Sequence, residues 1–89
     1  MRLFLGRHYK IEIDPAMRSV YERDFVIVKM MNFDKASGEA LGSIVGEPIP
    51  CSLDRRWVIP YPFLRNDRYH SISIVECSHD ELVQYLLEV

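Results

Sequence analysis

The residues best suited to chemistry lie in one stretch of the sequence, 55–70 (RRWVIPYPFLRNDRYH). Aromatic, arginine and proline side chains are interleaved there. Trp, Tyr and Arg dominate the contacts between proteins, and aromatic rings with arginines also hold single-stranded nucleic acid. The stretch therefore predicts a surface that binds a macromolecule. Its candidate partner-binding residues are Arg55, Arg56, Trp57, Tyr61, Arg65, Arg68 and Tyr69.

Three kinds of ligand fit this stretch. A protein partner is favoured because the net charge of the chain is −2, whereas nonspecific binding of nucleic acid relies on a basic field over a large surface. Single-stranded nucleic acid is the first alternative. A small molecule or nucleotide, bound at a subunit interface of a homo-oligomer, is the second. Within the stretch, we expect Trp57 and Ile59 to anchor the segment in the core, and Tyr61 with the flanking arginines to meet the partner.

The sequence has no motif of a known catalytic, cofactor-binding or metal-binding site. Gly-x-Ser-x-Gly and the glycine-rich nucleotide motifs are absent, and the soft metal ligands lack the Cys-x-x-Cys or helical His spacing of a metal site. Those ligands are His8, His70, His79, Cys51 and Cys77. We therefore assign no catalytic residue, cofactor or metal, and expect a non-enzymatic binding module, such as an inhibitor or an accessory subunit.

Composition and length predict one small folded domain over residues 1–89. Hydrophobic residues make up 48% of the chain and charged residues 27%, which is typical of a globular protein. The apolar run at residues 3–5 stops at Gly6 and Arg7, too early for a secretory signal peptide, and no run approaches the roughly 20 apolar residues of a membrane span. We expect a cytoplasmic protein with no membrane contact.

The sequence predicts the strands that position the 55–70 stretch. Apolar and polar residues alternate over residues 3–13 and 69–77, and residues 24–33 are apolar on both faces, which indicates a central strand. Residues 40–46 return as the next strand, and the stretch itself begins as an edge strand interrupted by Pro60 and Pro62. Residues 34–39 have the composition of a hairpin loop. Gly42 and Gly46 indicate places where a neighbouring side chain or backbone approaches closely.

A helix is predicted after the last strand. Ser78 and Glu81 have the spacing of a capping box. An apolar stripe follows, which Val83 and Leu87 widen, and its members are Leu82, Tyr85, Leu86 and Val89. A helix of about ten residues is marginal alone, so we expect it to dock on the sheet, with the Met30 face of residues 24–33 as its floor. Five strands and one helix resemble, in architecture alone, a small SH3-like or Greek-key barrel; an α+β fold with one helix packed on an antiparallel sheet is the alternative.

Overall fold

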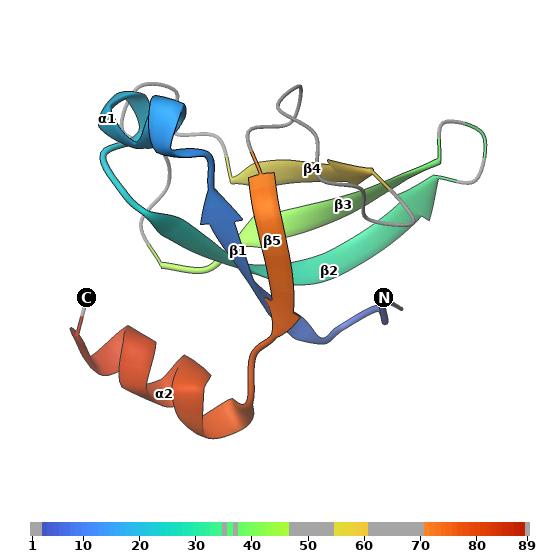
Figure 1. Cartoon of the computed structure of the whole chain (residues 1–89). Helices are drawn as coiled ribbons and strands as arrows, with labels where there is room; N and C mark the ends of the chain where they lie inside the picture. Colours follow the sequence, from blue (N-terminus) through green and yellow to red (C-terminus); the bar gives the residue numbers. More distant parts are fainter. Residues whose placement is uncertain (1–2, 35, 37, 47–54, 61–70, 89) are drawn as a thin grey trace.

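The described part of the chain forms eight short elements (Figure 1). The structure, a computed structural model, describes residues 3–34, 36, 38–46, 55–60 and 71–88. The elements are β1 (His8–Ile13), the 3-10 turn η1 (Pro15–Met17), α1 (Arg18–Tyr21), β2 (Phe25–Asp34), β3 (Glu39–Ile44), β4 (Arg56–Pro60), β5 (Ser71–Glu76) and α2 (His79–Glu88). The strands and the C-terminal helix lie where the sequence pattern predicts them, whereas η1 and α1 lie in a segment that shows no clean period in the sequence.

All five strands belong to one antiparallel sheet in the order β4-β3-β2-β1-β5. The first four strands are neighbours in sequence, and β5 then returns to pair with β1, where Tyr9 lies opposite Val28 on one side and Glu76 on the other. This confirms a mainly β fold of five strands with a C-terminal helix, and the α+β description fits it too. Among the described strands the sheet is open, so the closed barrel is not confirmed.

The first strand is shorter than its alternating pattern. It begins at His8 rather than near Leu3, because Gly6 takes a left-handed conformation (φ +79°) that ends the extended run. The Gly6 N–H donates to the Met30 carbonyl, at 2.8 Å. At the other end of the chain the capping box is confirmed, since the Glu81 N–H donates to the Ser78 hydroxyl and the Ser78 N–H to the Glu81 carboxylate.

The hydrophobic core lies on the face of the sheet that carries Val26, Val28 and Met30. Tyr9, Ile11 and Ile13 extend this face over β1, since Tyr9 and Ile11 pair with Val28 and Val26. The remaining core residues come from all the other strands and from the N-terminal segment, namely Leu3, Ala40, Ile44, Trp57, Ile59 and Ile74. Nearly all of the deepest packing is therefore on one side of the sheet.

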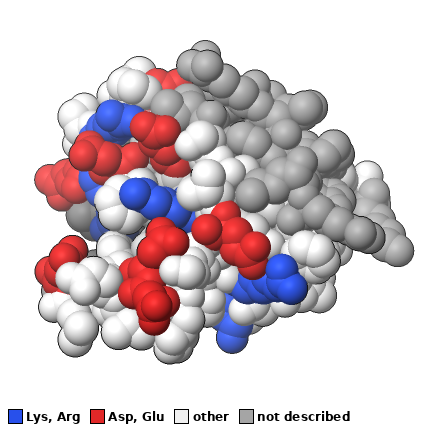
Figure 2. Space-filling model, turned by 60° about the horizontal axis from the view of Figure 1, so that its bottom comes forward, with Lys and Arg blue, Asp and Glu red and all other residues white. Residues whose placement is uncertain are grey.

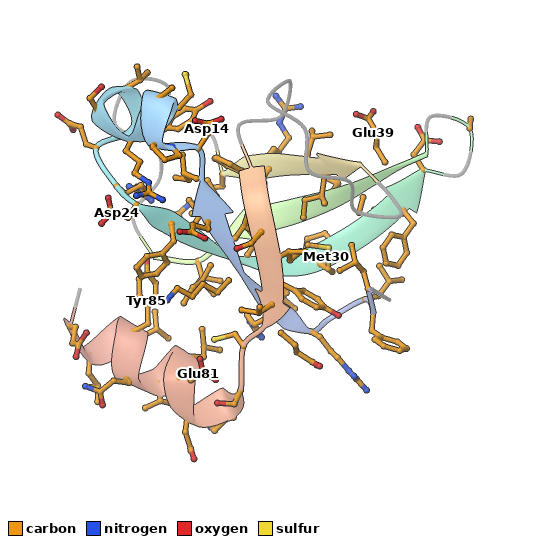
Figure 3. The ribbon with its side chains drawn as sticks, in the orientation of Figure 1. Asp14, Asp24, Met30, Glu39, Glu81 and Tyr85 are labelled. Carbon is orange, nitrogen blue, oxygen red and sulfur yellow. The ribbon has the colours of Figure 1, made fainter. Side chains whose placement is uncertain are left out.

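Helix α2 lies on the opposite face of the sheet (Figures 1 and 3). The Tyr85 ring points from α2 to the sheet and packs on Phe25, with 5.9 Å between ring centroids. Phe25 and Ile27 alternate with Val26 and Val28, so they face away from Met30. The prediction that the Met30 face is the floor of the helix is wrong. Both faces of β2 are apolar over residues 25–30, so the sequence pattern did not distinguish them.

Candidate binding surfaces

The structure describes three of the seven predicted partner-binding residues. Arg55 and Arg56 are exposed and Trp57 is buried. Tyr61, Arg65, Arg68 and Tyr69 lie outside the described residues.

Trp57 is a core residue. Only 5% of it is exposed, and its ring meets Tyr21 edge-on with 5.5 Å between the centroids. Ile59, two residues further along β4, is fully buried on the same face. The predicted anchoring of Trp57 and Ile59 is confirmed. In this chain the Trp57 ring holds β4 on the core and offers little surface to a partner.

The two arginines before Trp57 have different roles. The Arg55 guanidinium donates to the carbonyl oxygen of Ile44, at 3.1 Å, and to that of Gly46. These bonds tie the start of β4 to the end of β3, so Arg55 supports the fold. Arg56 lies opposite Ser43 in the β3–β4 pairing, and its side chain is exposed on the face away from the core. Arg56 thus presents an exposed side chain on the face of the sheet that lies away from the core.

Helix α2 carries an exposed apolar surface, which we call the outer stripe: Val83, Leu86 and Leu87. Their exposed fractions are 41%, 48% and 77%, and none of the described α2 side chains is buried. Spacings of three and four residues place the three side chains on one side of the helix. Tyr85 and Leu82 are half-buried instead, and the Tyr85 ring packs on Phe25 of the sheet. The helix therefore uses only part of its apolar surface within this chain.

Acidic side chains accompany the outer stripe. Helix α2 contains Asp80, Glu81 and Glu88 and has no lysine or arginine. Figure 2 shows the side of the molecule that carries α2, where acidic side chains lie among uncharged ones. A groove of about 340 Å³ separates α2 from the sheet, with Phe25 and Ile27 on the sheet side and Asp80 and Glu88 on the helix side.

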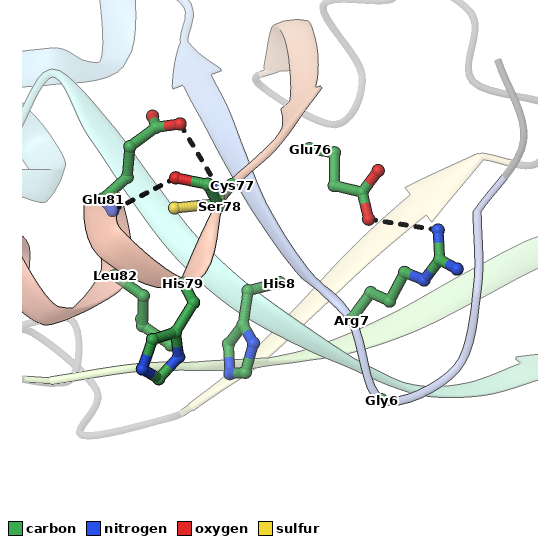
Figure 4. Close-up of a pocket in the computed structure, with 9 residues that line it drawn as sticks. All are labelled: Gly6, Arg7, His8, Glu76, Cys77, Ser78, His79, Glu81 and Leu82. Carbon is green, nitrogen blue, oxygen red and sulfur yellow. Dashed lines mark hydrogen bonds and ion pairs between the residues drawn. The ribbon is translucent and has the colours of Figure 1, made fainter.

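A second hollow, of about 480 Å³, lies between β1, the end of β5 and the start of α2 (Figure 4). Arg7 and Glu76 form an ion pair of 3.2 Å at one side of it, and both side chains are about half exposed. The imidazoles of His8 and His79 lie together at the other side (Figure 4). The proximity of these two histidines could not be predicted from their spacing in the sequence. It results from the pairing of β1 with β5.

The thiol in this hollow is poorly suited to nucleophilic chemistry. Cys77 is buried, and burial together with the nearby Glu81 carboxylate raises the pKa of its thiol. A raised pKa keeps the thiol protonated near neutral pH, whereas the thiolate is the reactive form. Within the described part of the chain, no group of three or more His, Cys, Asp or Glu side chains is arranged to hold a metal ion.

His8 gives the fold a testable pH dependence. Burial, followed by the charges of Lys29 and His79, lowers the pKa of His8 below its usual value of 6.5. His8 therefore binds a proton more readily in the unfolded chain than in the folded chain. The free energy of unfolding must rise with pH between the folded-state pKa of His8 and its usual value. We expect the free energy of unfolding to fall as the pH drops through 6.5 and to level off below the folded-state pKa of His8.

Urea unfolding at a series of pH values checks this expectation. His8→Gln removes the titrating group, so the fall in stability on acidification should be smaller in this variant than in the unaltered chain. Identical pH profiles for the two proteins would show that His8 does not titrate in this way.

No protein-family model, curated protein or solved structure matches this chain. None of the described helices is long and apolar enough to cross a membrane. The outer stripe was not among the predicted contact residues, although the sequence held its signal: five apolar side chains in six residues, 82–87, are more than one buried stripe needs.

Proposed function

We propose that this chain is a non-enzymatic binding module that docks on a protein partner, with the outer stripe at the centre of the contact. The observation that carries the proposal is the outward orientation of Val83, Leu86 and Leu87 on a helix whose other apolar side chains meet the sheet. Burying such side chains against a partner contributes roughly 1 kcal/mol or more for each of them. A short helix with this division of its surface is suited to binding a groove.

The arginine-rich stretch provides a second region of contact in this proposal. Arg56 projects from the same face of the sheet that α2 packs on, because it alternates with the buried Trp57. Tyr61, Arg65, Arg68 and Tyr69 follow it in the sequence and remain candidates. A cytoplasmic inhibitor or accessory subunit is the kind of protein that fits this reading. Single-stranded nucleic acid has weaker support, since the Trp57 ring is buried and unavailable for stacking on bases.

Affinity capture from the cell that produces the protein tests the proposal. The bait is the full chain, compared with a variant that carries Leu86→Asp and Leu87→Asp. Both leucines are exposed, so we expect each substitution to change the free energy of unfolding by less than about 1 kcal/mol. Circular dichroism then confirms that the variant is folded. The partner should be retained by the unaltered chain and lost from the variant.

A matched control is Val20→Asp, which adds a charge at an exposed apolar position of α1. This variant should retain the partner. Equal retention of the same proteins by all three baits contradicts the proposal. The nucleic-acid alternative would be favoured by two results together. The unaltered chain would recover nucleic acid that the Arg56→Glu variant does not, and no captured protein would depend on the outer stripe.

A further inference from the structure

The charges around the outer stripe point to the chemistry of the partner. Asp80 and Glu88 lie two turns apart on α2, with Gln84 between them, and we call these two carboxylates the acidic edge. Spacings of four residues place them along one flank of the helix, next to Val83 and Leu87. The Gln84 amide donates to the Glu88 carboxylate at 2.8 Å. Between the described residues, neither carboxylate of the acidic edge takes part in an ion pair.

The position of Glu88 is unfavourable for the helix alone. The C-terminal end of a helix carries the negative pole of the helix dipole and carbonyl groups without helical partners, so a cation is favoured there and an anion is not. Helix α2 has no basic residue in its last turn, and Glu88 adds a negative charge instead. A lysine or arginine brought by a partner would interact favourably with both the carboxylate and the carbonyl groups.

The lysine that lines the groove beside α2 forms no described ion pair with the acidic edge. Lys10 lines the same groove as Glu88, but its ammonium lies over the Phe25 ring, 4.4 Å from the centroid. Lys10 is therefore engaged with an aromatic face. The two carboxylates of the acidic edge line this groove and belong to exposed residues, so a partner can still reach them.

A second copy of the chain is a poor occupant for this surface. In a two-fold dimer that pairs the α2 helices in opposite directions, Asp80 of one copy would face Glu88 of the other. Facing like charges at an interface is unfavourable, whereas opposite charges steer and fix the register of a complex. The surface calls for a partner of opposite charge.

We infer that α2 docks on an apolar surface of a protein that is edged by lysine or arginine. Val83, Leu86 and Leu87 occupy the apolar part as i, i+3 and i+4 anchors, and the acidic edge meets the basic rim. This inference rests on the proposed function and adds to it the charge of the partner.

The test uses two fluorescein-labelled amphipathic peptides of the same length and leucine pattern, one with lysine and one with glutamate at the polar positions. Fluorescence anisotropy measures their binding to the full chain in about 0.05 M NaCl, where charges are least screened. We expect the lysine peptide to bind and the glutamate peptide to bind at least about tenfold more weakly. Raising the salt to about 0.5 M should weaken binding of the lysine peptide.

Variants separate the contributions of charge and apolar contact. Asp80→Asn with Glu88→Gln should weaken binding of the lysine peptide by about fivefold, and Leu86→Asp with Leu87→Asp by more than about thirtyfold. The matched control is Glu22→Gln with Asp24→Asn, which removes two exposed charges before β2 and should leave the affinity unchanged. Circular dichroism shows whether α2 survives the substitutions near its ends.

Equal binding of the two peptides, or an affinity that the Asp80 and Glu88 substitutions leave unchanged, overturns the inference. If the captured partner still depends on Leu86 and Leu87, the proposed function stands while its charge assignment fails. Analytical ultracentrifugation measures whether the chain is a monomer or a dimer. A dimer of the unaltered chain that Leu86→Asp with Leu87→Asp converts to a monomer would make a second copy the occupant, and would also overturn the inference.

Discussion

Replacing Trp57 by alanine is expected to lower the free energy of unfolding by about 3–5 kcal/mol. The side chain is 5% exposed, packs edge-on against Tyr21 and lies opposite Gly42 in the β3–β4 pairing. Its removal would leave a cavity beside a glycine, which has no side chain to fill it. A domain of this size has a total stability of roughly 4–13 kcal/mol, so the variant should be close to unfolding.

Urea denaturation followed by far-UV circular dichroism measures this loss, because Trp57 is the only tryptophan and fluorescence would lose its probe. The control is Val58→Thr, a change of β-branched residue at an exposed position of the same strand, facing away from the core. The control should change stability by no more than about 0.5 kcal/mol. A loss below about 1 kcal/mol for Trp57→Ala would contradict the burial of the ring and return Trp57 to the candidate contact residues.

Local patterns in the sequence predicted the elements well. Alternating or continuous apolar runs located the described strands of the sheet, and the Ser78–Glu81 capping box located the start of α2, because both signals depend on a few adjacent residues. The return of β5 to β1 left no comparable signal. The pairing joins residues 58 to 67 positions apart, from Ile13 with Ser71 to Tyr9 with Glu76, and both strands alternate in the same way, so neither pattern specifies the other as its neighbour.

The placement of α2 shows how a local pattern becomes ambiguous. The sequence showed an amphipathic helix that must pack on a sheet, yet β2 has apolar side chains on both faces. In the structure, side chains of the neighbouring strands pack with Met30 and form the hydrophobic core on that face. The helix then packed on Phe25, which left Leu86 exposed, although its spacing from Leu82 had placed it on the predicted buried stripe.

The predicted contact residues 55–57 have different roles in the structure, although they are adjacent in the sequence. Residue types and proximity grouped Arg55 with Arg56, but their partners differ: the guanidinium of Arg55 caps two carbonyl groups at the end of β3, which no short pattern records. Alternation within the strand did separate the buried Trp57 from Arg56, and the structure agrees. Long-range packing therefore decides which members of a promising stretch face a partner.

Gly42→Ala is the second substitution with a large expected effect. A methyl group at this position would lie 2.9 Å from both Cβ and Cγ2 of Val28 and 3.2 Å from the Met30 methyl group. The close approach predicted from the glycine is thus confirmed. Forcing extra volume into a packed core typically costs about 1–3 kcal/mol. We expect a loss of this size, with Ser43→Ala, on the opposite face of β3, as the nearly neutral control.

The sign of the change at Gly42 decides between two opposing effects. Gly42 does not have a left-handed backbone, so alanine restricts the unfolded chain and alone would stabilise the protein by about 0.4–1 kcal/mol. Contact with Val28 must outweigh this gain for the variant to be less stable. Val28→Ala removes Cγ2, and Gly42→Ala should therefore cost less in that background, with a coupling of about 0.5–3 kcal/mol in a double-mutant cycle of urea unfolding. If Gly42→Ala stabilises the chain, or if the two substitutions are additive, β3 does not lie against the Val28 side chain as the register of β2 and β3 requires.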